Sequence, residues 1–427
     1  MHKTHCRLRE LFVEQSKFGV MEKKLDRKNR RDNRIAVYSF FSCSGFLDLG
    51  FELAEGNPFE LRMANEIDPC FRECYRYARE HMDTPIAVPE DFIFENSIED
   101  FILRKRLPKK NKAATYEKFA ALLDEDRESG RLIGFIGGPP CPDFSIAGKN
   151  LGQKGNVGPL SSRYIRLILQ EKPDFFLFEN VKGLYSSSKH RAYFNYISGQ
   201  LNKEYLIDPQ VVNALWYKVP QHRERLIMIG VKKSLLPSFN KRSFHSALSW
   251  DSFQPFRKLV QHKKWPQTVE FTANADVPWP KESPTGETYD YIKELTVKYC
   301  WEKGQVTKHP NHQNQTRPRL SSMDRFKTIP EGSTAGKSYH RLNRFKYAFT
   351  AAYGHNEVPL HPWELRRISV AEALATQSLP FDFSFPPDMG ISALFKAVGN
   401  GVPFNMAKGL ASMIYQFLVN HLRERFL

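Results

Sequence analysis

The stretch LIGFIGGPPC, residues 132–141, joins an apolar run to a turn of two glycines and two prolines. The apolar run predicts a buried strand, and the glycines and prolines force a rigid turn after it. Cys141 therefore emerges at the carboxyl end of a strand, which is the edge of an open α/β sheet where ligands bind. A single thiol at this edge is a candidate nucleophile. The alternative is a structural cysteine that follows an ordinary turn.

Other predicted strands deliver polar residues to the same edge. An apolar strand over residues 35–41 is followed by the turn Ser42–Gly45 and a helix, a unit that offers helix N-terminal amides to a ligand. A second strand near residues 61–64 leads to Glu66, about 20 positions after that turn, where nucleotide-binding folds place an acid on a ribose diol. An N-cap or salt-bridge acid is the commoner explanation of Glu66.

Two more segments carry charged residues beside apolar strands. A strand over residues 174–178 leads to Glu179, and a carboxylate is costly there unless it is hydrogen-bonded or used. Arg223 and Arg225 precede a strand over residues 226–231, and their alternate spacing points both side chains the same way. A third strand is predicted to close at residues 96–98. Ser369 and Glu372 have the spacing of a capping box that opens a helix ending near Gln377.

Composition narrows the class of protein. The chain has 427 residues and a formal charge of +16, which favours a polyanionic partner such as nucleic acid. A generally basic surface is the alternative. No apolar run is long enough to cross a bilayer, and the six cysteines are scattered as in a reducing compartment, so we expect a cytoplasmic protein. Cys70 and Cys74 lack a second pair to complete a zinc site, so no metal is expected.

Taken in order, five motifs resemble those of the cytosine-5 DNA methyltransferases. They are Gly138-Pro139-Pro140-Cys141, Glu179-Asn180-Val181, Gln221-x-Arg223-x-Arg225, the segment Arg366–Gln377, and Gly399-Asn400-x-Val402-Pro403. Each motif alone is a weak signal, but five in this order are specific. The chain departs from the family's pattern where Cys43 and Phe46 replace usual glycines and Pro142 replaces a usual glutamine.

The resemblance implies a fold and a division of the chain. The fold is a doubly wound, Rossmann-like α/β sheet of an S-adenosylmethionine-dependent methyltransferase, with a second, smaller target-recognition domain. Residues 35–231 form the catalytic and cofactor-binding domain. The Lys and Arg content of residues 1–34 predicts a basic N-terminal arm that touches phosphates, and a solvated tail is an equal alternative. Residues 232–390 form the target-recognition domain. Its basic residues, Arg341 and Arg344 among them, are expected from the composition to face nucleic acid, and a solvated basic face is the alternative. Residues 391–427 return to the catalytic domain, after a predicted tight turn at Gly399–Pro403.

The resemblance also implies residue roles. Cys141 adds to C6 of cytosine, Glu179 hydrogen-bonds the N3 and N4 edge, Arg225 holds O2, and Arg223 supports the site. The glycine-rich loop after Cys141 closes over a base that has been flipped out of the duplex. Residues implied in binding S-adenosylmethionine are Phe41, Ser42, Gly45, Glu66, Ile67, Pro139, Asn400 and Val402.

The implied function is transfer of a methyl group from S-adenosylmethionine to C5 of cytosine in a specific double-stranded DNA sequence. The resemblance further implies a monomeric bacterial protein, associated with the nucleoid and paired in function with a cognate restriction endonuclease. Two alternatives remain, an RNA cytosine-5 methyltransferase on the same scaffold and a non-catalytic DNA-binding protein. A nicotinamide-dependent enzyme would need Gly-x-Gly-x-x-Gly after the first strand, and this chain has no such motif there.

Overall fold

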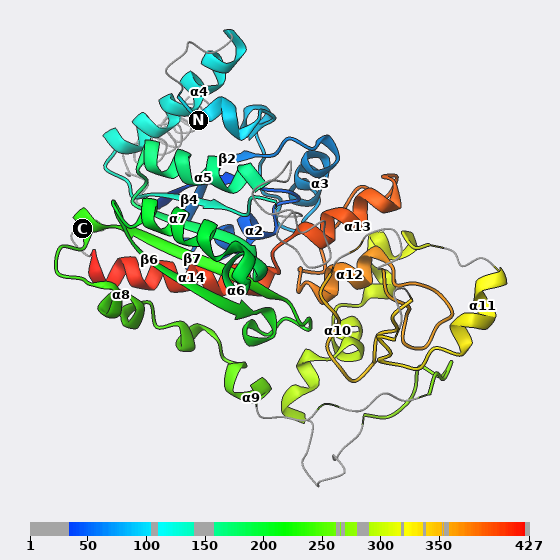
Figure 1. Ribbon diagram of the computed structural model, residues 1–427. Helices are drawn as coiled ribbons and strands as arrows, with labels where there is room; N and C mark the ends of the chain where they lie inside the picture. The colour runs from blue at the N-terminus through cyan, green and yellow to red at the C-terminus, as the bar shows by residue number, and fades with distance from the viewer. Residues whose placement is uncertain are drawn as a thin grey trace, which may run out of the picture.

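A single seven-stranded sheet forms the centre of the larger lobe (Figure 1). The computed structural model describes residues 34–103, 110–140, 158–261, 265, 270–279, 290–316, 320–335, 339–351, 353 and 358–422. The strands are β1 (Ile35–Phe40), β2 (Phe59–Asn65), β3 (Ile93–Phe94), β4 (Ile133–Gly137), β5 (Phe175–Val181), β6 (Tyr205–Asn213) and β7 (Glu224–Lys232).

The strand order is β3-β2-β1-β4-β5-β7-β6. Strand β1 pairs in parallel with both β2 and β4, and β4 pairs in parallel with β5. The chain thus winds outward from β1 in one direction and then from β4 in the other, which creates a switch point between these strands. Strand β7 is antiparallel to both of its neighbours, β5 and β6. The doubly wound α/β fold that the sequence predicted is confirmed.

Helices cover both faces of the sheet and continue into a smaller lobe (Figure 1). They are α2 (Phe46–Glu52), α3 (Pro69–Glu80), α4 (Lys110–Glu128), α5 (Gly158–Glu171), α6 (Gly183–Ser186), α7 (Arg191–Leu201), α8 (Lys241–Leu248), α9 (Arg257–Gln261), α10 (Val297–Lys303), α11 (Leu320–Lys327), α12 (Val370–Thr376), α13 (Ile391–Asn400) and α14 (Phe404–His421).

Strand β1 shows why the sheet is buried on both sides. Val37 points into a core formed with α2, α8 and α14, whereas Tyr38 points into a core formed with α4, α5 and α7. Successive side chains of a strand alternate between faces, so a strand buried on both faces must be apolar throughout. Helix α14 packs its apolar face on the sheet, and the side chains that do so are buried: Met406, Leu410, Met413, Ile414, Phe417 and Leu418.

The smaller lobe, coloured yellow to orange in Figure 1, contains α10, α11 and α12 and much irregular chain. A third hydrophobic core joins it to the larger lobe, because Phe46 and Phe71 from α2 and α3 pack in one cluster with Trp301, Phe383 and residues of α13. The two lobes are therefore continuous in their packing. The boundary of the target-recognition domain at residues 232 and 390 stays a prediction.

Three local predictions were wrong for physical reasons. The third strand lies at Ile93–Phe94 rather than residues 96–98, because Ser97 instead caps the short 3₁₀ helix Ile98–Phe101 by accepting a hydrogen bond from the Glu99 amide. Gly399 and Asn400 form the end of α13 rather than a tight turn, so the chain reverses only at residues 401–403.

The third wrong expectation concerns Arg341 and Arg344, which lie in the interior rather than facing nucleic acid. Arg341 donates hydrogen bonds to the carbonyls of Phe326 and Ile329 at 2.6 and 2.8 Å. Arg344 forms an ion pair with buried Glu331, with Nη2 2.5 Å from Oε1. Both guanidinium groups therefore organise the irregular backbone of the smaller lobe.

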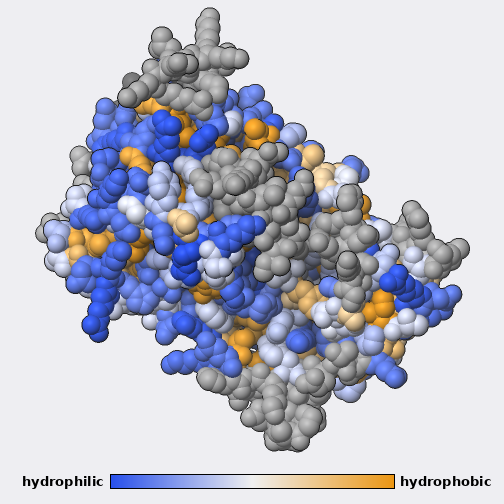
Figure 2. All heavy atoms as spheres, viewed as in Figure 1, coloured by the Kyte–Doolittle hydropathy of each residue, from blue (hydrophilic) through white to orange (hydrophobic). Residues whose placement is uncertain are grey.

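On the face shown in Figure 2, hydrophilic side chains cover most of the described surface, and hydrophobic ones occur in small separate patches. None of the helices within the described ranges has the length and apolar character needed to span a bilayer.

Candidate active site

The turn after β4 lies directly against the end of β5. The Nδ2 amide of Asn180 donates to the carbonyl of Pro139 at 3.3 Å. A Cβ atom added to Gly138 would lie 2.8 Å from Oε2 of Glu179, so only glycine leaves room for the carboxylate there. Cys141 and the glycine-rich loop up to residue 157 lie outside the described residues. Glu179 therefore lies beside Gly138, and Asn180 is hydrogen-bonded to Pro139, in the turn that leads into Cys141.

The antiparallel pairing of β5 with β7 explains how Glu179 meets Arg225. Val181 pairs with Arg225 and Glu179 with Ile227, so Glu179 and Arg225 are diagonal neighbours on the same face. Nε of Arg225 lies 3.0 Å from Oε1 of Glu179, and both side chains are mostly buried. Burial lowers the pKa of Arg225, and the nearby Glu179 carboxylate opposes that effect. The ion pair fixes the carboxylate at the carboxyl end of β5.

Arg223 is more deeply buried than Arg225 and hydrogen-bonds to two other segments of the chain. Its Nη1 donates to the carbonyl of Ala351 and its Nη2 to the carbonyl of Gly399, each at 3.1 Å. Burial, reinforced by the positive charge of Arg225, lowers the pKa of Arg223 to about 9. Its Nε has no hydrogen-bond partner among the described residues. Arg223 therefore links the start of β7 to the backbone carbonyls of Ala351 and Gly399, and its supporting role in the site stays a prediction.

The implied cofactor residues gather where β1 and β2 end. The Ser42 amide donates to the carbonyl of Asn65 at 3.0 Å, and the Cys43 amide donates to Oε2 of Glu66 at 2.9 Å. The other carboxylate oxygen of Glu66 accepts from the Asp68 amide at 2.8 Å. Burial raises the pKa of Glu66, while these backbone donors oppose that rise. Glu66 is thus held rigidly beside the first turn.

Two apolar residues flank this turn. Ile67 is 64% exposed and presents its apolar side chain beside Glu66. Phe41 packs edge-on against Tyr164, with 6.1 Å between ring centroids.

The segment after α13 returns to the same turn. The hydroxyl of Ser44 donates to the carbonyl of Ala397 at 3.4 Å. A Cβ on Gly401 would lie 2.2 Å from the ring of Phe46, so the backbone between Asn400 and Val402 touches the start of α2. Val402 is buried and Asn400 is exposed. The structure thus brings the turn Ser42–Gly45 and the motif Gly399–Pro403 together at the ends of β1 and β2.

Sequence reasoning missed a buried polar network beneath this turn. Asp48 in α2 accepts hydrogen bonds from Ser39 and Tyr75, and Arg79 in α3 donates to the carbonyl of Gly45. The signal for Asp48 was its position between Leu47 and Leu49, within the apolar stretch from Phe46 to Phe51. No pattern in the sequence pointed to Arg79.

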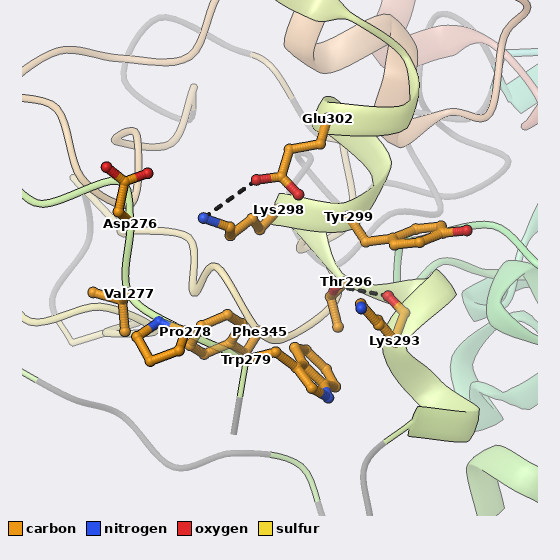
Figure 3. Close-up of a pocket in the computed structure, with 10 residues that line it drawn as sticks. All are labelled: Asp276, Val277, Pro278, Trp279, Lys293, Thr296, Lys298, Tyr299, Glu302 and Phe345. Atoms are coloured by element: carbon orange, nitrogen blue, oxygen red, sulfur yellow. Dashed lines mark hydrogen bonds and ion pairs between the residues drawn. The ribbon is translucent and has the colours of Figure 1, made fainter. Parts of the chain in front are cut away.

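The smaller lobe has a cavity of its own, of about 300 Å³, between residues 276–279 and the first turns of α10 (Figure 3). Trp279 and Phe345 form one wall, with ring centroids 5.2 Å apart. Lys298 is paired with Glu302 at 3.2 Å, whereas Lys293 is exposed at the rim. Within the described ranges, no three His, Cys, Asp or Glu side chains are grouped so as to hold a metal ion.

Comparison with known proteins shows which family the chain belongs to. Residues 110–416 match the family model described as C-5 cytosine-specific DNA methylase. The chain is 42% identical over 386 residues to the Type II methyltransferase M.NmeDI of Neisseria meningitidis serogroup C, which covers 90% of this chain and 84% of that protein. It is 30% identical over 301 residues to the Type II methyltransferase M.PspPI of a Psychrobacter strain, with 69% and 67% covered.

A solved structure described as a DNA modification methyltransferase, encoded within a prophage of E. coli, shares the fold. It has a TM-score of 0.57 and 23% identity, and the match covers 91% of this chain and 99% of that one. The order of motifs, the sheet and these similarities agree. The chain belongs to the C-5 cytosine-specific DNA methylases, and it is a DNA cytosine-5 methyltransferase.

Proposed function

We propose that Cys141, Glu179, Arg223 and Arg225 carry out methyl transfer from S-adenosylmethionine to cytosine C5 in a specific sequence of duplex DNA. The observation that carries this assignment is the buried Glu179–Arg225 pair, 3.0 Å apart, against the turn that leads into Cys141. A carboxylate and a guanidinium on one face can hydrogen-bond N3 and the N4 amino group on one side of a cytosine and O2 on the other.

The chemistry gives each residue a task. Cytosine C5 is a poor nucleophile until a thiolate adds to C6, which moves the C5–C6 electron pair to C5. Cys141 supplies that thiolate. Glu179 hydrogen-bonds N3 and the N4 amino group, so that N3 can take a proton as the ring gains charge. Arg225 donates to O2. Loss of the C5 proton after methylation restores the double bond and expels the thiolate of Cys141.

The ends of β1 and β2 have the chemistry to hold the cofactor. When bound, S-adenosylmethionine supplies an electrophilic methyl group on its sulfonium sulfur. The rigid Glu66 carboxylate suits the ribose hydroxyls, and exposed Ile67 suits the apolar face of adenine. Phe41, Ser42, Gly45, Pro139, Asn400 and Val402 are the remaining proposed contacts.

Duplex DNA is the proposed substrate, and the smaller lobe is the proposed reader of its sequence. A base inside a duplex cannot reach Cys141, so the target cytosine must be flipped out. Exposed Lys293 and half-buried Trp279, which line the same cavity, supply a phosphate-contacting group and a stacking group in that lobe. The further proposal is a monomeric cytoplasmic enzyme that acts at the nucleoid. The Type II naming of the relatives supports only its proposed role of protecting DNA from a cognate endonuclease.

A transfer assay with methyl-labelled S-adenosylmethionine tests the proposal. We expect label on bacterial genomic DNA, none with Cys141→Ser, and bisulfite sequencing to place every modified cytosine in one sequence context. Transfer to tRNA in preference to DNA would favour the RNA alternative. Equal labelling by the wild type and Cys141→Ser would remove Cys141 from the mechanism.

A further inference from the structure

The turn from Phe41 to Gly45 has an unusual backbone. Phe41, Cys43 and Gly45 have positive φ angles of 57°, 50° and 78°. Only glycine adopts such angles freely, because a Cβ atom crowds the following carbonyl oxygen. Two non-glycine residues in this region persist only where the surroundings hold them. The surroundings of the turn should therefore contain a specific restraint.

Arg79 in α3 provides a direct contact with the turn. Its side chain is completely buried, and Nη2 donates to the carbonyl of Gly45 at 3.2 Å. The same nitrogen lies 2.7 Å from Oε2 of Glu52, at the end of α2. The guanidinium group also lies over the ring of Tyr75, with Cζ 3.7 Å from the ring centroid. Arg79 thus joins the turn, α2 and α3 at one point.

A second chain of hydrogen bonds runs beneath the turn. The hydroxyl of Tyr75 donates to Oδ2 of Asp48 at 3.0 Å, and the hydroxyl of Ser39 donates to Oδ1 at 2.6 Å. The hydroxyls of Ser39 and Ser42 are 2.9 Å apart. All four residues are buried, so water cannot replace these bonds.

The fit around Gly45 is tight. A Cβ atom there would lie 2.4 Å from Nη1 of Arg79 and 2.6 Å from the ring of Tyr75. Nη1 has no hydrogen-bond partner among the described residues. A buried charge with an unpaired donor is costly, and an apolar side chain would fill the same space without that cost. Packing alone does not account for an arginine here.

We propose that Arg79 is a positioning residue, which clamps the Gly45 carbonyl and holds the Phe41–Gly45 turn in the conformation that binds the cofactor. The inference rests on the proposed role of that turn in binding S-adenosylmethionine. Arg79 acts through the backbone of Gly45 and reaches no reacting atom.

Calorimetric titration with S-adenosylhomocysteine tests the clamp without any need for turnover. Arg79→Lys keeps the charge but loses the planar fork that contacts Gly45 and Glu52 together. We expect its Kd to rise about tenfold, with kcat at saturating cofactor changing much less. Arg76→Lys is the matched control, since Arg76 lies on the same helix and donates to the carbonyls of Val88 and Glu90 instead of the turn. Its Kd should equal that of the wild type.

A rescue variant separates a clamp from general support of the fold. Cys43→Gly removes the strain at φ 50°, so the double variant Cys43→Gly, Arg79→Lys should recover most of the lost affinity. If Arg79→Lys proves too unstable to purify, Tyr75→Phe removes only the bond to Asp48 and should weaken binding in the same direction. Equal Kd values for Arg79→Lys and the wild type, or no recovery in the double variant, would overturn the inference alone. A wild type that does not bind S-adenosylhomocysteine would overturn the proposed cofactor as well.

Discussion

The absence of a Cβ atom at Gly138 leaves room for the carboxylate of Glu179. Gly138 has an ordinary backbone conformation, so its requirement for glycine comes from the 2.8 Å separation that a Cβ would have from the Glu179 carboxylate. Glu179 is in turn held by Arg225. The carboxylate therefore sits between two fixed neighbours, and small displacements should affect chemistry more than stability.

Gly138→Ala tests this placement. The added methyl group must push the carboxylate aside, and a displacement of about 1 Å at a reacting group costs on the order of 100-fold in rate. We expect kcat to fall by about that factor while the melting temperature changes little. Gly199→Ala is the control, because a Cβ there meets no atom within 4 Å. A Gly138→Ala enzyme with wild-type kcat would contradict the proposed role of Glu179.

Asp48 should make stability depend on pH. Burial, opposed by Arg79, raises the pKa of Asp48 from 3.8 to about 6. The folded state therefore holds the Asp48 proton more tightly than the unfolded state does. This contribution is fully present below pH 3.8 and is lost as pH rises through about 6.

The measurement is the free energy of unfolding of the wild type and Asp48→Asn by urea titration between pH 4.5 and 7.5. The wild type should lose about 2 kcal/mol relative to Asp48→Asn as the pH rises across this range, because the unfolded state is already mostly ionised at pH 4.5. A difference that is constant with pH would show that Asp48 is ionised throughout.

At the scale of elements, helix α12 begins at a complete capping box. Ser369 accepts from the Glu372 amide at 3.2 Å, and Glu372 accepts from the Ser369 amide at 2.7 Å. Glu372 also pairs with Arg366, with Nη2 2.7 Å from Oε1. The short helix therefore depends on its cap more than on its length.

Ser369→Ala should lower the free energy of unfolding by about 1–2 kcal/mol, because it removes the side-chain acceptor from a buried helix start. Ser246→Ala, at an exposed position in α8, should change it by less than about 0.5 kcal/mol. Thermal unfolding of the two variants side by side measures the difference. Equal stability of both would mean that water replaces the cap.

The elements that could be predicted are those whose burial shows in the sequence. Strands β1, β4 and β5 are apolar because both faces are covered, and the capping box followed from the spacing of Ser369 and Glu372. Strand β6 could not be predicted, because Asp208 and Pro209 in its middle are typical of turns. It tolerates them as an edge strand, where Trp250 Nε1 donates to Asp208 at 2.7 Å.

Some residues of the candidate site could likewise be predicted from the sequence, and others could not. Glu179 and Arg225 could be predicted because each lies beside an apolar strand that fixes its place. The contact of Arg79 with Gly45 could not, since it depends on how α2 and α3 pack together. The burial of Arg341 and Arg344 could not be predicted either. Their carbonyl partners come from irregular chain, whose path the sequence does not specify.

At the scale of the whole molecule, the formal charge of +16 predicts DNA binding that weakens steeply with salt. If Lys293 contacts a phosphate, Lys293→Ala should reduce the slope of log affinity against log salt by about 1. Fluorescence anisotropy with a labelled duplex at several salt concentrations gives the slope. Lys241→Ala, on α8 of the larger lobe, should leave it unchanged. Identical slopes for the two variants would remove Lys293 from the DNA contacts.

Helix α14 packs against α2, although more than 350 positions separate them along the chain. The hydrophobic core beneath β1 is therefore incomplete until residues 404–421 have left the ribosome. A nascent or truncated chain exposes the apolar surface of α2 to water and to chaperones and proteases. The cell thus gains a working methylase only after residues 404–421 have been translated, and a nonsense mutation anywhere before them should behave as a complete loss of the gene.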